Sequence, residues 1–116
     1  LVDHRPEDQY VGINRHPKAP ESGTLAGAKN LPNGWMTVNG MGQFRSKSQL
    51  EQLYKVANVP TSGEQINFCN TGHWASVGWF VSSELMGNKK ARMYDGSMVE
   101  WTLLKGGGME QKVKLN

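Results

Sequence analysis

The sequence lacks the features that several classes of protein need. Among its 116 residues there is one cysteine, Cys69, which excludes a disulfide within the chain and a metal site built from several thiolates. It has no apolar run near the roughly 18 residues that a membrane-spanning helix needs, and no segment with the features of a signal peptide. Its 13 Lys and Arg residues are scattered and leave a net charge of +3, so the charge pattern does not indicate nucleic-acid binding. We therefore expect no metal, no cofactor, no membrane span and no nucleic-acid partner.

What remains is enough for one globular domain. A content of 37% hydrophobic and 20% charged residues is typical of soluble proteins, and we expect the domain to cover residues 1–105. Gly106-Gly107-Gly108 then leads into a polar segment, so residues 106–116 are expected to form a flexible C-terminal tail. The chain opens on Leu1-Val2-Asp3, which reads as part of a buried strand, and we infer that an N-terminal portion is missing.

The apolar pattern alternates between strands and helices. The clearest helix follows Ser46, an N-cap residue with Gln49 three positions later, which is a capping-box arrangement. Its apolar residues recur at helical spacing before Pro60: Leu50, Leu53, Tyr54 and Ala57. We expect further helices over 75–86 and 97–104, strands over 1–3, 28–32, 65–69 and 91–94, and a long irregular segment over 12–34. This alternation predicts an α/β fold with a mostly parallel sheet and helices on both faces.

Cys69 lies where a predicted strand gives way to a predicted helix. In an open parallel sheet, ligands bind at such junctions. The loop after the cysteine is short and contains Gly72, so its backbone N–H groups can surround the sulfur as an anion cradle, with the positive end of the next helix aimed at the same place. Both effects favour the thiolate, which is the nucleophilic form. A lone cysteine after an apolar strand can equally be a small buried hydrophobe, and the spacing alone leaves both interpretations open.

Several segments together resemble a rhodanese domain, and most closely the C-terminal, catalytic half of tandem-domain thiosulfate or mercaptopyruvate sulfurtransferases. They occur in the order typical of that family and extend to about residue 104: Leu1–Arg5, Ser22–Pro32, Phe68–Ser76, Met93–Ser97 and Glu100-Trp101. The resemblance implies a rhodanese-like three-layer fold. It also implies that a further, N-terminal rhodanese-like domain belongs to the protein, and it favours a periplasmic location, with a cytoplasmic one as the alternative.

The resemblance also implies a reaction. Cys69 would attack the outer sulfur of a small anionic donor, thiosulfate or 3-mercaptopyruvate, and form a persulfide. A thiol or cyanide would then accept that sulfur. The backbone amides of the active-site loop would stabilise the persulfide and the developing anion, and that loop comprises Asn70, Thr71, Gly72, His73, Trp74 and Ala75. The resemblance assigns Asp3 and Arg5 to structural support.

The sequence departs from the family pattern at the positions that bind the donor. Many rhodanese loops carry Arg or Lys two to five residues after the cysteine, where this sequence has Thr71 to Trp74. Of these, His73 is either a candidate substrate contact or a residue that faces solvent. Trp74 is either an aromatic residue of the core or an apolar wall over the cradle. Mercaptopyruvate sulfurtransferases instead use basic residues of the loop after the first strand, which makes Arg15 and Lys18 further substrate-binding candidates. Gln9 stands where those enzymes carry their first such arginine.

Two other functions share parts of this pattern. Cysteine phosphatases and arsenate reductases use a similar cradle but need an arginine six positions after the cysteine, and that position is Ala75. A partner-binding rhodanese module, or a carrier that receives its persulfide from another protein, would need no charged loop residue. The uncharged loop keeps this second alternative open.

Overall fold

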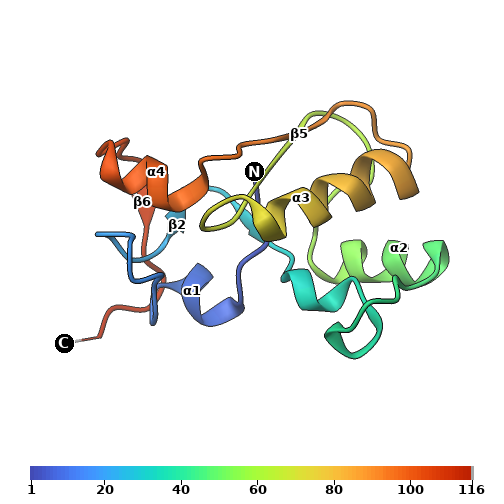
Figure 1. Ribbon diagram of the computed structural model, residues 1–116, viewed down its shortest axis with the longest axis horizontal. Helices are drawn as coiled ribbons and strands as arrows, with labels where there is room; N and C mark the ends of the chain where they lie inside the picture. The colour runs from blue at the N-terminus through green and yellow to red at the C-terminus, as the bar shows by residue number, and fades with distance from the viewer. Residues whose placement is uncertain (116) are drawn as a thin grey trace.

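The computed structural model describes residues 1–115 and has a four-stranded sheet at its centre. The strand order is β3-β1-β4-β5 and every neighbouring pair is parallel. The strands are β1 (Val2–Asp3), β3 (Lys29–Asn30), β4 (Gln65–Phe68) and β5 (Ala91–Met93). Because consecutive strands run the same way, each connection crosses a face of the sheet, and the carboxyl ends of all four strands lie at one edge. The predicted α/β fold is confirmed (Figure 1).

Helices make most of these crossings, and their ends follow local sequence signals. Ser46 caps helix α2 (Lys47–Val56) through the capping box with Gln49 that the sequence predicts. Helix α3 (His73–Phe80) begins two residues earlier than expected, because Gly72 takes the left-handed conformation that sets it off, and it continues as a wider π-helical turn, η3 (Val81–Leu85). The remaining helices are α1 (Glu7–Val11), α4 (Ser97–Leu103) and the short 3-10 turns η1 (Asn33–Trp35) and η2 (Val38–Gly40).

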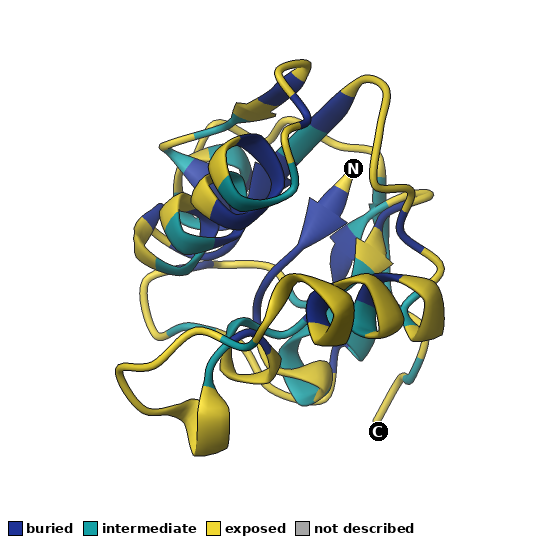
Figure 2. Cartoon of the chain, turned by 90° about the vertical axis from the view of Figure 1, so that its right-hand side faces the viewer, coloured by how far each residue is buried: buried dark blue, intermediate teal, exposed yellow. Residues whose placement is uncertain are grey.

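Two hydrophobic clusters cover the two faces of the sheet. One joins the sheet to α2 and η3 and includes Leu50, Tyr54 and Val81, all at most 1% exposed. The other joins Phe68 of β4 to Met98 of α4. Figure 2 shows buried strands between helices whose outer faces are exposed. Phe80, within the helix predicted over 75–86, is 39% exposed and packs against Phe44 with ring centroids 5.6 Å apart.

The C-terminal residues differ from the expected frayed tail. Strand β6 (Met109–Glu110) pairs antiparallel with β2 (Thr24–Leu25), which lies within the segment expected to be irregular. Gly23 permits this pairing, because its φ is +102° and a Cβ there would lie 2.3 Å from the Glu110 carbonyl oxygen. Val113 adds a backbone hydrogen bond to Val11. The pairing depends on contacts across some 85 residues, which local composition does not reveal. No helix within residues 1–115 combines the length and apolar character needed to cross a bilayer.

Candidate functional site

Cys69 lies at the carboxyl edge of the sheet, directly after β4. β4 is an inner strand, flanked by β1 and β5, so the cysteine is centred on that edge. Its residue is 1% exposed, and it leads through a three-residue loop into α3. This is the strand-to-helix junction at which open α/β sheets bind their ligands.

The loop turns one backbone N–H onto the sulfur. The Gly72 N–H donates to Cys69 Sγ at 3.1 Å, and α3, whose helix dipole is positive at this end, begins at the next residue. Gly72 has a φ of +100°, and a Cβ there would lie 2.6 Å from both the carbonyl oxygen and Oδ1 of Asp95. Glycine is therefore required at this position on both conformational and packing grounds. Of the loop amides predicted to form the cradle, the Gly72 N–H is the one that hydrogen-bonds to Sγ within residues 1–115.

Ser97 holds the cysteine from the opposite side. Its Oγ accepts the Cys69 N–H at 3.0 Å, donates to the Tyr94 carbonyl at 2.8 Å, and lies 4.0 Å from Sγ. Ser97 has a φ of +53°, which costs a non-glycine residue about 1 kcal/mol. The next amide, Met98 N–H, donates to the Cys69 carbonyl at 2.9 Å. The start of α4 therefore fixes the backbone of Cys69. Nothing in the spacing of the Asp95-Gly96-Ser97 sequence indicates contact with Cys69.

Gln9 is a second site residue that the sequence pattern did not assign. The buried Asn70 donates through Nδ2 to Gln9 Oε1 at 2.7 Å, across 61 residues of sequence. Asn70 Oδ1 is buried without a hydrogen-bond partner in residues 1–115. This contact ties α1 to the loop at the residue after the nucleophile. Gln9 therefore brings a neutral amide, and no charge, to the rim of the site.

The first strand supports this edge through a buried ion pair. Arg5 Nη2 lies 2.7 Å from Asp3 Oδ2, with both side chains at most 1% exposed. Thr24 donates to the same carboxylate at 2.8 Å, and Arg5 also donates to the Gly23 carbonyl at 2.7 Å. Both carboxylate oxygens of Asp3, and Nε and Nη2 of Arg5, are therefore paired within the core, as a buried ion pair requires. Asp3 and Arg5 thus fit the expected structural role and join β1 to the β2 segment.

His4 connects β1 to β4, the strand that leads into Cys69. It is fully buried, with Nδ1 2.9 Å from the Leu31 carbonyl and Nε2 2.6 Å from Asn67 Oδ1. Burial lowers the pKa of His4 below its ordinary value of 6.5, and the contacts with Asn67 and Leu31 and the charge of Asp3 oppose that shift. Gly78 of α3 packs on the ring, because a Cβ there would lie 2.2 Å from Nε2. His4 therefore helps to set how α3 lies against the sheet.

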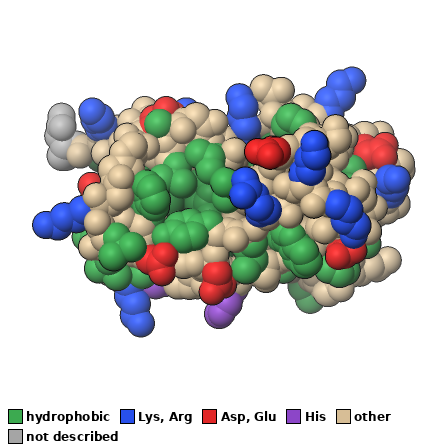
Figure 3. Space-filling view, turned by 90° about the horizontal axis from the view of Figure 1, so that it is seen from above, with side chains coloured by type: hydrophobic (Ala, Val, Ile, Leu, Met, Phe, Trp, Pro, Cys, Tyr) green, Lys and Arg blue, Asp and Glu red, His purple; other side chains and the backbone are tan. Residues whose placement is uncertain are grey.

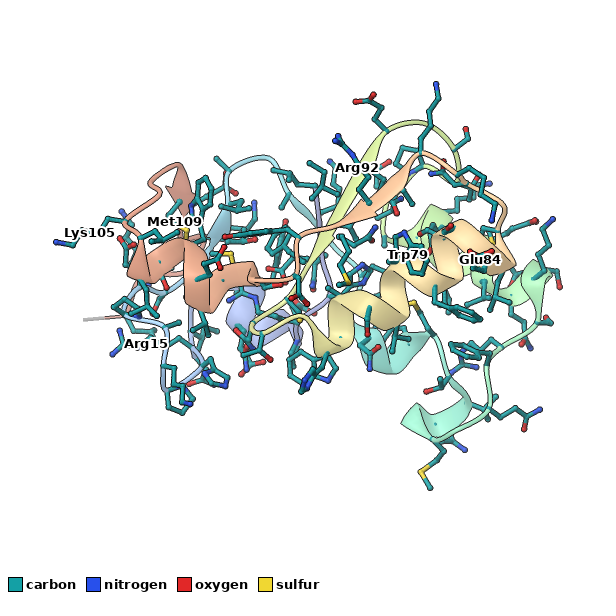
Figure 4. All side chains as sticks on the ribbon, turned by 45° about the horizontal axis from the view of Figure 1, so that its top comes forward. Arg15, Trp79, Glu84, Arg92, Lys105 and Met109 are labelled. Carbon is teal, nitrogen blue, oxygen red and sulfur yellow. The ribbon has the colours of Figure 1, made fainter. Side chains whose placement is uncertain are left out.

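Two of the residues predicted to bind substrate, Arg15 and Lys18, make no hydrogen bond or ion pair with the Cys69 loop within residues 1–115. Arg15 donates to the Pro20 carbonyl at 3.3 Å and lines a separate hollow of about 470 Å³ that contains no residue of the Cys69 loop. Figure 4 shows Arg15 on the side of α4 and β6, away from the first turn of α3. Lys18 is exposed, and its backbone N–H donates to His16 Nδ1. The irregular segment turns toward β6, which separates Arg15 from the loop.

The other loop residues differ in their exposure. Thr71 and His73 are exposed, Trp74 is half-buried, and Ala75 is 0% exposed. Trp74 is therefore not a core residue. Its half-buried position is compatible with a wall beside the cradle, which stays a prediction. Across residues 1–115 no three His, Cys, Asp or Glu side chains come together as metal ligands would.

An apolar hollow of about 600 Å³ lies apart from this site. Its lining includes Phe68, Tyr94, Trp101, Gly107 and Gly108. Figure 3 shows hydrophobic side chains gathered around it on the upper face of the molecule. Cys69 is not among the residues that line this hollow.

The chain is similar in sequence to proteins named as thiosulfate sulfurtransferases. The chain is 37% identical over 108 residues to "Putative thiosulfate sulfurtransferase SseA" of Mycobacterium leprae, a match that covers 87% of this chain and 35% of the relative. It is 35% identical over 117 residues to "Putative thiosulfate sulfurtransferase" of Mycolicibacterium smegmatis, covering 95% of this chain and 42% of the relative. The chain thus spans well under half the length of these relatives.

Solved structures give the same fold. The yeast Tum1 protein from Saccharomyces cerevisiae superposes with a TM-score of 0.81 at 24% identity, over 97% of this chain and 40% of Tum1. Wild-type EanB also superposes with a TM-score of 0.81, at 21% identity, over 97% of this chain and 28% of EanB. At these identities the likeness concerns the fold alone. The model of the rhodanese-like domain matches residues 1–104, and the chain belongs to that family.

Proposed function

We propose that the protein is a sulfurtransferase in which Cys69 carries the sulfur as a persulfide. One observation supports this most directly, the Gly72 N–H that donates to Cys69 Sγ at 3.1 Å at the carboxyl end of β4. A donor at that distance stabilises a thiolate and, after transfer, the negative charge of a persulfide. The names of the relatives point to thiosulfate as donor, and 3-mercaptopyruvate is the second candidate.

In the first step the Cys69 thiolate attacks the outer sulfur of the donor. A bond forms between Sγ and that sulfur, and the bond from this sulfur to the rest of the donor breaks. From thiosulfate, sulfite leaves with the electron pair. From 3-mercaptopyruvate, the enolate of pyruvate leaves and takes up the proton of the donor thiol. In the second step a thiolate or cyanide attacks the outer sulfur of the persulfide, and the Cys69 thiolate leaves.

Intact-mass spectrometry tests the first step directly. Incubation with thiosulfate or 3-mercaptopyruvate should add one sulfur atom to the protein, and a reducing thiol should remove it. Cys69→Ser should gain none, because it lacks the nucleophile. If the wild-type protein gains no sulfur from either donor, the proposed function is wrong.

A persulfide carrier is the second candidate, and the uncharged loop favours it. Thr71 to Trp74 provide no permanent cation, so a small dianion is held by backbone dipoles alone and a partner protein becomes the better source of sulfur. We propose that such a partner is a second domain of a longer protein, because the relatives are more than twice as long as this chain.

A periplasmic location is proposed only from the resemblance to exported tandem sulfurtransferases.

Phosphatase or arsenate reductase activity has less support. Ala75, at the position where those enzymes need an arginine, is 0% exposed. A guanidinium would not fit in its place without moving the first turn of α3. An aryl phosphate should therefore not be hydrolysed.

A further inference from the structure

Gln9 and Asn70 form the side-chain contact that joins α1 to the loop after Cys69. Asn70 Nδ2 donates to Gln9 Oε1 at 2.7 Å, and Asn70 is 3% exposed. Asn70 Oδ1 is buried without a partner within residues 1–115, so the buried amide group depends on Gln9 for its hydrogen bond. Two residues further along the same loop, the Gly72 N–H donates to Cys69 Sγ. A change at Gln9 therefore reaches the loop that carries this N–H.

The loop is held from a second side as well. The Val99 N–H of α4 donates to the Asn70 carbonyl at 3.0 Å, which fixes the Asn70 backbone and leaves its side chain to the contact with α1. Thr71, between Asn70 and Gly72, is exposed. Asn70 is therefore the buried side chain that anchors the short link between Cys69 and Gly72.

Helix α1 is too short to hold Gln9 in place without help. It has five residues, and none of them is buried. Isolated helices of fewer than about 12 residues are marginal in water, because forming the first turn is costly. Tyr10 ties one face of α1 to the segment before β3, since its hydroxyl donates to the Ala28 carbonyl at 2.7 Å. The last turn of α1 needs further support, and a distant part of the chain supplies it.

The C-terminal segment 109–113 holds the last turn of α1. The Val113 N–H donates to the Val11 carbonyl at 2.9 Å, and Gln111 Nε2 donates to the Gly12 carbonyl at 3.1 Å. A Cβ at Gly12 would collide with the Gln111 side chain, so the two residues are in close contact. Strand β6 anchors the same segment on β2, and Figure 1 shows it passing beside β2 and α1. A series of contacts therefore runs from the C-terminal segment through α1 to the loop.

We propose that Gln9 is a positioning residue for Cys69 and that the C-terminal segment 109–113 holds it in that role. The inference rests on the proposed function for its part in sulfur transfer, because the thiolate that Gln9 helps to maintain is the one that attacks the donor. By engaging the Asn70 amide, Gln9 keeps the loop folded so that the Gly72 N–H stays on Sγ. Gln9 takes no part in making or breaking the sulfur bonds. It acts on the loop, although the resemblance places it where mercaptopyruvate sulfurtransferases carry an arginine.

Gln9→Ala removes the partner of the buried Asn70 amide. The loop then moves to bring that amide to water, and the Gly72 N–H no longer stabilises the thiolate. A buried polar group without its partner costs a factor of about five at the lower end of the usual range, so we expect about five times less thiolate at neutral pH. The midpoint of the pH profile for alkylation of Cys69 should therefore rise by about 0.7 pH unit. At high pH, where the thiol is ionised in both proteins, this deficit in thiolate disappears.

The charged groups around the loop stay the same in these variants. Asp95 lies against Gly72, His73 opens α3, and Glu7 and Asp8 form the first turn of α1. Each variant replaces one neutral side chain by another, so a shifted midpoint reports the position of the loop rather than a new charge.

The test measures alkylation of Cys69 by iodoacetamide as a function of pH, followed by intact mass. Gln9→Ala should raise the midpoint by about 0.7 pH unit, and Gln111→Ala, which loosens the C-terminal segment from α1, should raise it by a smaller amount. Asn70→Ala should also raise the midpoint, and adding Gln9→Ala to it should cause no further shift, because the two residues act as one unit. Gln52→Ala is the matched control, because Gln52 is an exposed glutamine of helix α2. It should leave the midpoint unchanged.

Each outcome decides the matter. An unchanged midpoint in Gln9→Ala overturns the inference, and so does a further shift when Gln9→Ala is added to Asn70→Ala. An unchanged midpoint in Gln111→Ala overturns the part assigned to the C-terminal segment. These measurements need no sulfur transfer, so they stand apart from the test of the proposed function. If the midpoints shift as expected but the wild type gains no sulfur from thiosulfate or 3-mercaptopyruvate, the proposed function is wrong although the positioning of Cys69 by Gln9 is correct.

Discussion

Replacing Ser97 tests whether α4 holds the nucleophile in place. In Ser97→Ala the Cys69 N–H loses its acceptor at 3.0 Å and the Tyr94 carbonyl loses its donor at 2.8 Å. Ser97 is 0% exposed, so water cannot replace these bonds, and leaving a buried polar group unpaired costs about 1–3 kcal/mol. We expect the free energy of unfolding to fall by about 2 kcal/mol.

Ser97→Gly separates the hydrogen bonds from the backbone conformation. It loses the same two bonds, but glycine adopts a φ of +53° without the strain of about 1 kcal/mol that serine or alanine carries there. Ser97→Gly should therefore be more stable than Ser97→Ala by about 1 kcal/mol, although glycine lowers stability at most buried positions. Both variants should form the Cys69 persulfide more slowly than the wild type.

Urea unfolding followed by tryptophan fluorescence measures both differences. The reasoning fails if Ser97→Ala is as stable as the wild type, or if Ser97→Gly is the less stable of the two variants. Ser62→Ala is the matched control, because Ser62 is exposed in the turn before β4. It should change the free energy of unfolding by less than about 0.5 kcal/mol.

Two further predictions concern the loop and the core. Gly72→Ala should lower the free energy of unfolding by at least about 2 kcal/mol, because its Cβ would lie 2.6 Å from Asp95 and its φ is +100°. The same variant should not load sulfur. Unchanged sulfur loading, measured by intact mass, would contradict a role of the Gly72 N–H in holding the sulfur. His4 should make the fold less stable in acid, because burial lowers its pKa in the folded protein. Below pH 6.5 the His4 side chain takes up a proton more readily in the unfolded chain than in the folded protein. The free energy of unfolding therefore falls as the pH drops through 6.5. Urea titrations at pH 7.5 and 5.5 should show a smaller acid loss in His4→Gln than in the wild type, and an equal loss would refute this assignment.

The elements were predictable where the cause is local. The capping box at Ser46, the helical spacing of Leu50 and Tyr54, and the strand just before Cys69 all appear where the sequence places them. The sequence did not predict the position of a side chain where that position depends on contacts with residues far away in the sequence. Phe80 keeps the helical spacing of its apolar neighbours, yet it is exposed and packs against Phe44. Arg15 and Lys18 follow the first strand as the resemblance requires, but the segment turns toward β6 and takes Arg15 to another hollow.

The sequence by itself determined the class of fold and the place of Cys69 within it. Alternating strand and helix patterns imply a parallel sheet, and a lone cysteine between a strand and a glycine-containing loop can only lie at its carboxyl edge. The tertiary structure alone decided which side chains surround that cysteine. Gln9 contacts Asn70, which lies 61 residues later in the sequence, and Ser97 contacts Cys69, which lies 28 residues earlier. These contacts form because the strand order β3-β1-β4-β5 places the ends of β1 and β5 on either side of β4. Strand order arises from the packing of the whole sheet, so no local pattern around Cys69 could have specified its neighbours.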